Sequence, residues 1–418
     1  MGNTPNIRFK GFTDDWEQRK LGDVMNVTSV KRIHQSDWTD SGVRFLRARD
    51  IVAAAKNEDP DDYLYISKEK YEEYSALSGK VNIDDLLVTG VGTIGVPYLV
   101  KNLEPLYFKD GNIIWFQNQK KIAGNFLYYS FIGNEIQSFI NASAGTGTVG
   151  TYTIDSGKKT PIHLPCKEEQ EKIGNYFSNL DHLITLHQRK CDETKKLKKF
   201  MLQKMFPKKD EKKPEIRFAG FTDDWEQRKL GSLVIDHNAG IYISKEDYGS
   251  GTNVIGVGNI YDNDIFDGKI YRLGPVNDDR FLLEENDLIY GESSLVPEGI
   301  ARTVCVGENG AGSAFAWHTR RVKLNQNLVN SHFATLELNY NVTIRKYLMS
   351  VSTQTALTGM TTEGYFGATL VLPSVKEQTE ISAFFRNLDH LITLHQRKCD
   401  EIKEIKKFML QNMFPQKG

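Results

Sequence analysis

The segment NLDHLITLHQRKCDE decides the architecture of this chain, because it occurs at Asn179–Glu193 and again at Asn387–Glu401. Each copy lies within a longer related stretch, residues 167–206 and residues 375–414, at an offset of 208 positions. Fifteen identical positions at one offset indicate a duplication rather than chance. Internal repeats of this length define the organisation of a chain before any other feature. The chain is therefore predicted to contain two equivalent halves.

Each long stretch is predicted to form one helix of roughly 60 Å. Proline lies before and after each stretch, where it marks helix ends rather than interrupting them: Pro165 and Pro207, and Pro373 and Pro415. Apolar residues recur at alternating steps of four and three, which is typical of a coiled coil. The predicted seam contains Ile173, Phe177, Leu180, Ile184, His187 and Cys191, and then Ile381, Phe385, Leu388, Ile392, His395 and Cys399.

Two arrangements of these helices follow from the pattern. They pair with each other, in which case the polar seam residues His187 and Lys198 and their copies set register or orientation. Alternatively, each is an amphipathic helix packed on its own domain. Matching seams on two nearly identical helices favour the first arrangement.

A second repeat defines the domains. The segment GFTDDWEQRKLG occurs at Gly11–Gly22 and at Gly220–Gly231. The predicted segments are a lead (1–23), a first body (24–166), a first spacer helix (167–206), a linker with the second lead (207–232), a second body (233–374) and a second spacer helix (375–414). The lead and spacer-helix segments are nearly identical in the two halves, whereas the bodies share little sequence. We therefore expect the leads and helices to have one common task and the two bodies to have different tasks.

Both bodies are predicted to be mixed α/β domains of one fold. In the first body, β-branched and aromatic runs predict strands at Val43–Val52, Asn82–Val100 and Gly111–Gln119. Helical spacing predicts helices at Lys68–Leu77 and Ala123–Ser143, followed by a Gly/Thr-rich loop, Ala144–Lys159. The second body repeats this order loosely, in Thr252–Asp262, Glu285–Ser294, Ala314–Leu324, Leu328–Ser352 and Thr355–Pro373.

Composition is that of an ordinary globular protein, with 418 residues, 39% hydrophobic and 26% charged. The sequence has no long apolar run and no signal-peptide core, so we expect no membrane partner and a cytoplasmic location. Its four cysteines form no C-x-x-C pair, which argues against zinc and against a disulfide framework. A net charge of −1 neither indicates nor excludes a nucleic-acid partner, since the distribution of charge matters more than its sum.

Catalytic motifs are missing from the sequence. It has no G-x-x-x-x-G-K-[ST], H-E-x-x-H or G-x-S-x-G, and no Pro-Pro pair such as an amino-methyltransferase loop requires. Two G-x-G-x-x-G matches, Gly90–Gly95 and Gly145–Gly150, run into β-like sequence rather than a helix, so they indicate tight turns. His182 and His187 lie five apart and so do not share a helix face as metal ligands would. The chain is predicted to be non-catalytic, without metal or cofactor.

Cationic and hydroxyl side chains in the bodies are candidates for DNA contacts. Arginine can bind guanine with two hydrogen bonds, and lysine, serine and threonine contact phosphates. Any one of them alone is also explained as an ordinary surface residue. The candidates are Lys31, Arg32, Arg44, Arg47, Arg49, Thr89, Thr93, Thr146, Thr148, Lys158 and Lys159 in the first body, and Ser293, Ser294, Arg302, His318, Arg320, Arg321, Thr361 and Thr362 in the second.

The order of lead, variable body and long helix, given twice, resembles the specificity subunit of Type I restriction–modification systems. The resemblance is carried by FTDDWEQRKLGD (Phe12–Asp23), DDLLVTGVGTIG (Asp84–Gly95), the Leu-Pro and Glu-Gln entries into both helices (Leu164 to Gln170 and Leu372 to Gln378) and the fifteen-residue repeat. It covers essentially the whole chain.

This resemblance implies a fold and a function. The fold is α/β (α+β), with two target-recognition domains separated by two long helices packed as an antiparallel coiled coil in a pseudo-twofold repeat. Each body would read one half of a split, asymmetric target in double-stranded DNA. The helices would set the half-site spacing and dock two DNA adenine methyltransferase (modification) subunits, with restriction subunits joining through that core. S-adenosylmethionine, ATP and Mg²⁺ would belong to those partners.

Two other functions fit parts of the sequence. A methyltransferase fused to its own recognition domains would need the missing catalytic loop and a longer chain. A coiled-coil scaffold or adaptor that does not bind DNA is compatible with the composition, and it predicts no DNA selectivity in any complex.

Overall fold

The computed structural model describes residues 4–144, 150–209, 211–260, 269–354 and 357–415. The chain divides into two compact units, one formed by residues 1–188 with 396–418 and the other by residues 189–395. Each unit contains one body and one part of each long helix. In the part of the chain that the structure describes, no helix is both long and apolar enough to cross a membrane.

The body of the first unit is built on a four-stranded sheet that is buried on both faces. Its strand order is β2-β9-β6-β7, with every neighbouring pair antiparallel. Because side chains of a strand alternate between faces, Leu86 and Val88 of β6 pack in one hydrophobic cluster and Leu87 in another. The strands are β2 (Asn26–Thr28), β6 (Leu86–Thr89), β7 (Pro97–Leu99) and β9 (Ile113–Gln117).

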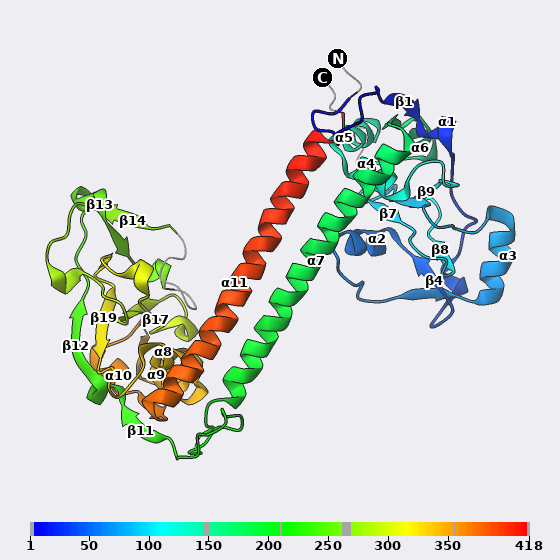
Figure 1. Cartoon of the computed structure of the whole chain (residues 1–418). Helices are drawn as coiled ribbons and strands as arrows, with labels where there is room; N and C mark the ends of the chain where they lie inside the picture. Colours follow the sequence, from blue (N-terminus) through cyan, green and yellow to red (C-terminus); the bar gives the residue numbers. More distant parts are fainter. Residues whose placement is uncertain (1–3, 145–149, 210, 261–268, 355–356, 416–418) are drawn as a thin grey trace. The chain divides into compact units, whose positions relative to one another are not determined.

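Helices cover one face of this sheet, and a second small sheet of order β3-β5-β4-β8 covers the other (Figure 1). The bounds are β3 (Trp38–Thr39), β4 (Val43–Leu46), β5 (Leu64–Ile66), β8 (Leu106–Phe108), α1 (Leu21–Val24), η1 (Gln35–Asp37), α2 (Ala48–Ala55), α3 (Lys68–Ser78), α4 (Gly124–Ile132), α5 (Asn134–Ser143) and α6 (Ile154–Lys159).

The body of the second unit contains a four-stranded sheet of the same plan, β12-β19-β15-β17, again antiparallel throughout. A sheet of order β14-β13-β18 and a small one of order β16-β21-β20 complete it. The bounds are β12 (Val234–Ala239), β13 (Tyr248–Ile255), β14 (Tyr271–Leu273), β15 (Leu288–Gly291), β16 (Ser293–Ser294), β17 (Thr303–Cys305), β18 (Ala314–Phe315), β19 (Thr319–Leu324), β20 (Thr353–Gln354), β21 (Thr358–Gly359), α8 (Ser331–Tyr340), α9 (Val342–Val351) and α10 (Thr362–Phe366), with short 3₁₀ turns η2 (Leu230–Leu233), η3 (Lys245–Asp247), η4 (Val257–Asn259), η5 (Asp279–Phe281), η6 (Pro297–Gly299) and η7 (Glu308–Gly310).

The two long helices are α7 (Lys167–Lys204) and α11 (Val375–Asn412), each of 38 residues. In the first unit, Asp181 pairs with Lys406 while Ile184 contacts Cys399, so the two segments run antiparallel. In the second unit, Cys191 contacts Ile392 and Lys198 pairs with Asp389, which gives the same direction. The predicted pairing of the long helices with each other is confirmed within both units.

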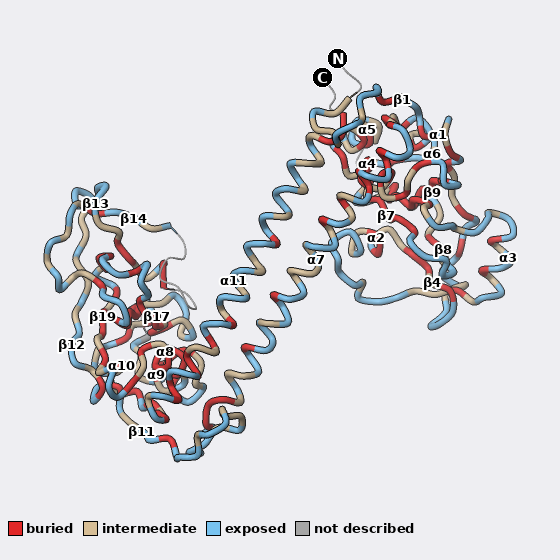
Figure 2. Tube along the Cα trace, viewed as in Figure 1, coloured by how far each residue is buried: buried red, intermediate tan, exposed pale blue. Residues whose placement is uncertain are grey.

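The seam, however, has two parts. Ile173, Phe177 and Leu180 are buried in the core of the first body, and their copies Ile381, Phe385 and Leu388 in the core of the second (Figure 2). Between these segments the helices pair through the buried Cys191 and Cys399 and through Ile184, His187, Ile392 and His395, which are half-buried. Near each body the seam packs on that body and on the other long helix together, since Ile402 and Met409 of α11 adjoin the first core and Met201 and Leu202 of α7 adjoin the second.

The repeated lead segments tie each body to the helix ends. Strand β1 (Glu17–Lys20) of the first lead pairs with β10 (Pro161–Leu164). Strand β11 (Glu226–Lys229) of the second lead pairs with β22 (Thr369–Leu372) in the same register. Arg8 binds the buried carboxylate of Glu169 with two hydrogen bonds of 2.9 and 2.8 Å, and Arg217 binds Glu377 in the same way at 2.6 and 2.8 Å. Such two-pronged charged pairs are strong and directional.

The glutamines that follow these glutamates connect each helix to its body. Gln170 accepts a hydrogen bond from the Ala123 backbone and donates to the carbonyl of Pro165, while Gln378 does the same with Asn330 and Pro373. The Leu-Pro and Glu-Gln entries that the two halves share are thus the joints at which each helix leaves its body.

Three predicted elements of the first body were wrong in extent. The strand predicted over Val43–Val52 ends at Leu46, because the Asp50 carboxylate accepts the Arg47 N–H at 2.8 Å and starts α2. The helix predicted over Ala123–Ser143 is divided at Gly133 into α4 and α5. The predicted loop Ala144–Lys159 contains α6, which the Thr153 hydroxyl caps by accepting the Ser156 N–H.

In the second body, the helix predicted over Leu328–Ser352 is likewise two helices, α8 and α9. The Asn341 side chain lies at their junction and caps α9 by accepting N–H groups of Thr343 and Ile344. The predicted loop Thr355–Pro373 contains β21, α10 and β22 (Thr369–Leu372).

Candidate nucleic-acid interface

Loops meet at one end of the four-stranded sheet in each body. In the first, the Gly90 N–H donates to the Asn112 carbonyl at 2.7 Å, and the Tyr152 N–H donates to the Gly90 carbonyl at 2.8 Å. These bonds bring together residues 90–95, 109–112 and 150–152, which we call the first rim. Loops at the end of a rigid sheet can vary without changing the core, which is why binding residues often lie there.

The second body has the same arrangement. The Glu292 N–H donates to the His318 carbonyl at 2.9 Å, and the Met360 N–H donates to the Glu292 carbonyl at 2.8 Å. Residues 292–301, 316–318 and 357–361 form this second rim. Its three segments correspond to those of the first rim, although the residues they carry are different.

Of the first body's candidate threonines that the structure describes, Thr93 lies exposed in the first rim and Thr89 does not. Thr93 is exposed, whereas Thr89 is fully buried, and its hydroxyl donates to the Thr93 carbonyl and accepts the Val96 N–H. Thr89 is therefore a residue of the turn rather than of the surface. Thr146 and Thr148 lie outside the described residues.

The basic candidates nearest the first rim are exposed. The Arg32 Nε lies 3.8 Å from a carboxylate oxygen of Asp110, which belongs to the rim. Lys31 places its ammonium 4.0 Å from the centre of the Tyr74 ring. Lys158 and Lys159 are exposed at the end of α6, beside the lead residue Gly22 and not in the rim.

The arginines around β4 lie in a different setting. Arg44 stacks over the Tyr63 ring at 3.8 Å, and Arg49 pairs with Asp62 at 2.5 Å. Arg47 binds Asp50 and Asp62, and its hydrogen bonds to Asp62 hold the pKa of that carboxyl below its usual range. The charge of Arg47 is thus compensated within the body.

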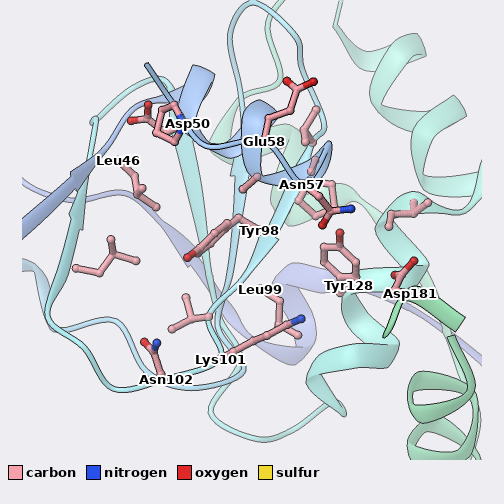
Figure 3. A pocket seen from close by; sticks show the side chains of 18 of the residues that line it. Leu46, Asp50, Asn57, Glu58, Tyr98, Leu99, Lys101, Asn102, Tyr128 and Asp181 are labelled. Atoms are coloured by element: carbon pink, nitrogen blue, oxygen red, sulfur yellow. The ribbon is translucent and has the colours of Figure 1, made fainter. Parts of the chain in front are cut away.

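A groove of about 1090 Å³ adjoins Arg44 and runs along α2, β7 and α7 (Figure 3). Burial raises the pKa of the Tyr98 and Tyr128 hydroxyls that face it. Its charged lining includes both signs: Arg44, Lys101 and Lys406, and Asp50, Glu58 and Asp181. A polyanion prefers a surface of one sign, so this lining of both signs does not favour DNA.

The second rim gathers several candidates that are far apart in sequence. Ser293 and Ser294 form β16, His318 lies in the turn before β19, and Arg320 pairs with the rim residue Glu292. Thr361 caps α10 by accepting the Gly364 N–H, and Thr362 is the first residue of that helix.

Two other candidates of the second body differ from these. Arg321 is only 3% exposed, and it donates to Asp236 and to the carbonyl of Leu282. It therefore joins strands and is not a surface residue. Arg302 is half-buried at the start of β17, at the end of the connection that crosses the rim.

Exposed apolar residues in and beside the second rim were not predicted from the sequence. The Tyr242 ring is 72% exposed and lies 5.8 Å from that of Trp317, which is 45% exposed and contacts His318. Leu295 and Val296 are also exposed. The sequence does carry a signal, because apolar residues between Ser294 and the Pro297 turn are unusual in a loop.

The fold and the rims define a class of protein: two mixed α/β bodies of one plan, carried by two long paired helices, with unlike loops at matching sheet ends. Among the described residues no cluster of His, Cys, Asp or Glu is arranged to hold a metal. The family model of the Type I restriction modification DNA specificity domain matches twice, over residues 13–196 and 222–404. The chain belongs to this family, as a specificity subunit with two DNA specificity domains, and DNA binding follows from that membership.

Similar proteins agree with this assignment. The putative type I restriction enzyme MjaX specificity subunit of Methanocaldococcus jannaschii is 24% identical over 418 residues, covering 94% of this chain and 91% of that protein. A putative type I specificity subunit of Haemophilus influenzae is 32% identical over 168 residues, 40% of each protein. The Type I S subunit of M. genitalium has a crystal structure with a TM-score of 0.64 at 14% identity, covering 99% of this chain and 100% of that one. The predicted family and fold class are confirmed.

Proposed function

We propose that each body reads one half of a bipartite, asymmetric sequence in double-stranded DNA, the first body with the first rim and the second with the second. The observation that carries this proposal is that one sheet plan supports two unlike rims. The first presents Val91, Gly92 and Thr93 after its central strand, and the second presents Ser293, Ser294 and Leu295. Different side chains at matching places favour different bases, because direct reading depends on donors, acceptors and methyl contacts.

The segments 1–23, 24–166, 167–206, 207–232, 233–374 and 375–414 are proposed to be the functional divisions of the chain. A helix of 38 residues has a length of about 57 Å, and we propose that the paired helices set the half-site spacing. The chain itself catalyses nothing in this proposal. S-adenosylmethionine, ATP and Mg²⁺ belong to methyltransferase and restriction partners in the cytoplasm.

Exposed apolar residues outside the seam support docking of two methyltransferase subunits on the helices. Each precedes a seam residue by one position or follows one by two, so all lie on one flank of the seam. Three of them recur in both units as copies at the repeat offset: Leu183, Ile405 and Phe408 in the first unit, and Leu391, Leu197 and Phe200 in the second. Exposed apolar patches of this kind mark interaction sites, and a duplicated patch suits two copies of one partner.

A methylome tests the reading of DNA. The chain is expressed with its cognate methyltransferase subunit in a host without adenine methylation, and N6-methyladenine is mapped by sequencing. We expect one two-part asymmetric motif, and we expect exchange of residues 24–166 for another body to change one half only. Methylation that never depends on this chain, despite a folded complex, would favour the scaffold function instead.

Loss of one apolar patch should remove one partner. Phe408→Ser is expected to reduce the complex from two methyltransferase subunits to one, as is Phe200→Ser, and the double variant should bind none. Both side chains are about half exposed, at 56% and 48%, so the fold should be unaffected. Native mass spectrometry gives the stoichiometry.

The control for this experiment is Glu404→Ser, an exposed position of the same helix outside the apolar flank. It should retain both subunits. If Phe408→Ser and Phe200→Ser also retain both, the partners dock elsewhere.

A further inference from the structure

The second body crosses its rim with a longer connection than the first. The N–H of Thr89 donates to the Val96 carbonyl in the first body, and that of Gly291 donates to the Arg302 carbonyl in the second. The connection from Gly291 to Arg302 is therefore four residues longer than that from Thr89 to Val96. The extra length carries Leu295, whose side chain is 87% exposed, and Val296.

This connection is held in place by side-chain hydrogen bonds. The Ser294 hydroxyl donates to the Val296 carbonyl at 2.7 Å and accepts the Val296 N–H at 3.3 Å. From α9, one guanidinium nitrogen of Arg345 donates to the carbonyls of Glu298 at 2.9 Å and Ile300 at 2.7 Å. A Cβ at Gly299 would approach the Ser294 hydroxyl to 2.5 Å, so glycine allows the loop to close on that serine.

The hydrogen bonds that fix this loop explain why the Leu295 side chain stays in solvent. A flexible loop would fold such a side chain back onto the body, because burial of a leucine stabilises by about 1.5–3 kcal/mol. Here the backbone is fixed on both sides of the residue. An apolar side chain held out on a preorganised loop loses little conformational entropy on binding, so it is suited to enter a partner.

We infer that Leu295 enters the base stack of the second half-site as a wedge. The inference rests on the proposed function, and it adds insertion between base pairs as a further means by which the second body recognises its DNA sequence. Leucine is among the side chains that DNA-binding proteins insert between base steps, and the energy of opening a step depends on its sequence. Ser293 and Ser294 directly precede Leu295 and carry hydroxyl groups of the kind that contacts bases or phosphates.

The exposed aromatic residues in and beside the second rim are less suited to insertion. Tyr242 and Trp317 pack on each other at 5.8 Å, and Trp317 also contacts His318, so they form a platform beside the connection. The matching turn of the first rim carries Gly92 and Thr93, with no large apolar side chain held out in the same way. Of these two matching turns, the one in the second body carries the wedge.

The test uses the complex of the full chain with its methyltransferase subunits and duplexes with 2-aminopurine at successive positions of the target. We expect a several-fold fluorescence rise at one step of the second half-site, where the base unstacks. Leu295→Ala should abolish the rise and weaken binding by roughly 10- to 100-fold, which corresponds to burial of one leucine side chain. Leu295→Met, which retains an apolar side chain of similar length, should preserve both.

Leu103→Ala is the matched control, since Leu103 is a highly exposed leucine of the first body outside its rim, and it should change neither signal. The inference is overturned if no position of the second half-site gives a rise away from the methylated base, or if Leu295→Ala leaves the rise intact. The methylome separates this outcome from failure of the proposed function: a motif whose second half still follows the second body leaves that function standing without the wedge.

Discussion

Phe414→Ala is expected to destabilise the first unit by about 3–5 kcal/mol, the usual cost of removing a buried phenylalanine. Although Phe414 lies beyond the end of α11, its ring is buried between those of Trp16, Phe126 and Phe177, at centroid distances of 6.4, 5.7 and 5.8 Å. The backbone is joined here as well, because the Ile7 N–H donates to the Asn412 carbonyl at 2.9 Å. The lead, the body and the far end of the chain thus share one core.

Hydrogen–deuterium exchange during denaturant unfolding measures this effect unit by unit. Protection should fall in β1, α4 and the first turns of α7, while the second unit is unchanged. Phe206→Ala should do the reverse, since Phe206 packs with Trp225, Phe333 and Phe385 in the second unit. Phe408→Ala, a change at an exposed position in the last turns of α11, should shift stability by less than about 0.5 kcal/mol. Equal losses for Phe408→Ala and Phe414→Ala would contradict the shared core.

Asp389→Ala is expected to lower the free energy of unfolding of the second unit by about 2–4 kcal/mol. The Lys198 ammonium is buried and lies 2.6 Å from the Asp389 carboxylate. Removal of one partner leaves a charge without compensation, which costs about 3–5 kcal/mol in a fully buried pair. We reduce the figure because the Asp389 side chain is partly exposed.

A double variant checks this prediction, with the free energy of unfolding measured for each protein. The double variant Lys198→Met with Asp389→Leu should recover most of the loss, because two apolar side chains replace the pair without an unpaired charge. The control is Glu401→Ala, which breaks the exposed pair with Lys398 on the same helix and should cost less than about 1 kcal/mol. If Asp389→Ala costs no more than Glu401→Ala, the seam pair has no special role.

The duplicated sequence explains why these pairs favour antiparallel helices. In a parallel pairing in register, each residue would face its own copy, so Lys198 would meet Lys406 and Asp181 would meet Asp389. Antiparallel pairing instead joins Lys198 to Asp389 and Lys406 to Asp181. This argument supports the predicted role of Lys198 in setting the orientation of the two helices. His187 and His395 are half-buried in the same seam.

Much of the fold was predictable because its signals are local. The repeat at Asn179–Glu193 and the alternating apolar spacing indicated two long helices and two equivalent bodies. Element boundaries were less accurate where a single side chain starts or divides a helix, as Asp50, Thr153 and Asn341 do. Such caps depend on the position of one side-chain oxygen, which apolar periodicity does not report.

The site was less predictable, because residue type does not reveal burial or neighbours. Thr89 and Arg321 have suitable chemistry for DNA contact, yet one completes a turn and the other joins strands inside the body. Conversely, Leu295 has no hydrogen-bonding side-chain group, and the loop that carries it is bound by Arg345, fifty residues later in the chain.

The sequence by itself determined that this protein consists of two related halves with long amphipathic helices and unlike bodies, because identity at a fixed offset and helical periodicity are properties of the chain alone. Only the tertiary structure decided which rim residues come together, what the repeated arginines Arg8 and Arg217 hold, and why the last phenylalanine belongs to the first core. Those features depend on segments that are remote in sequence and adjacent in space, since hydrogen bonds and apolar contacts form between neighbours in the fold.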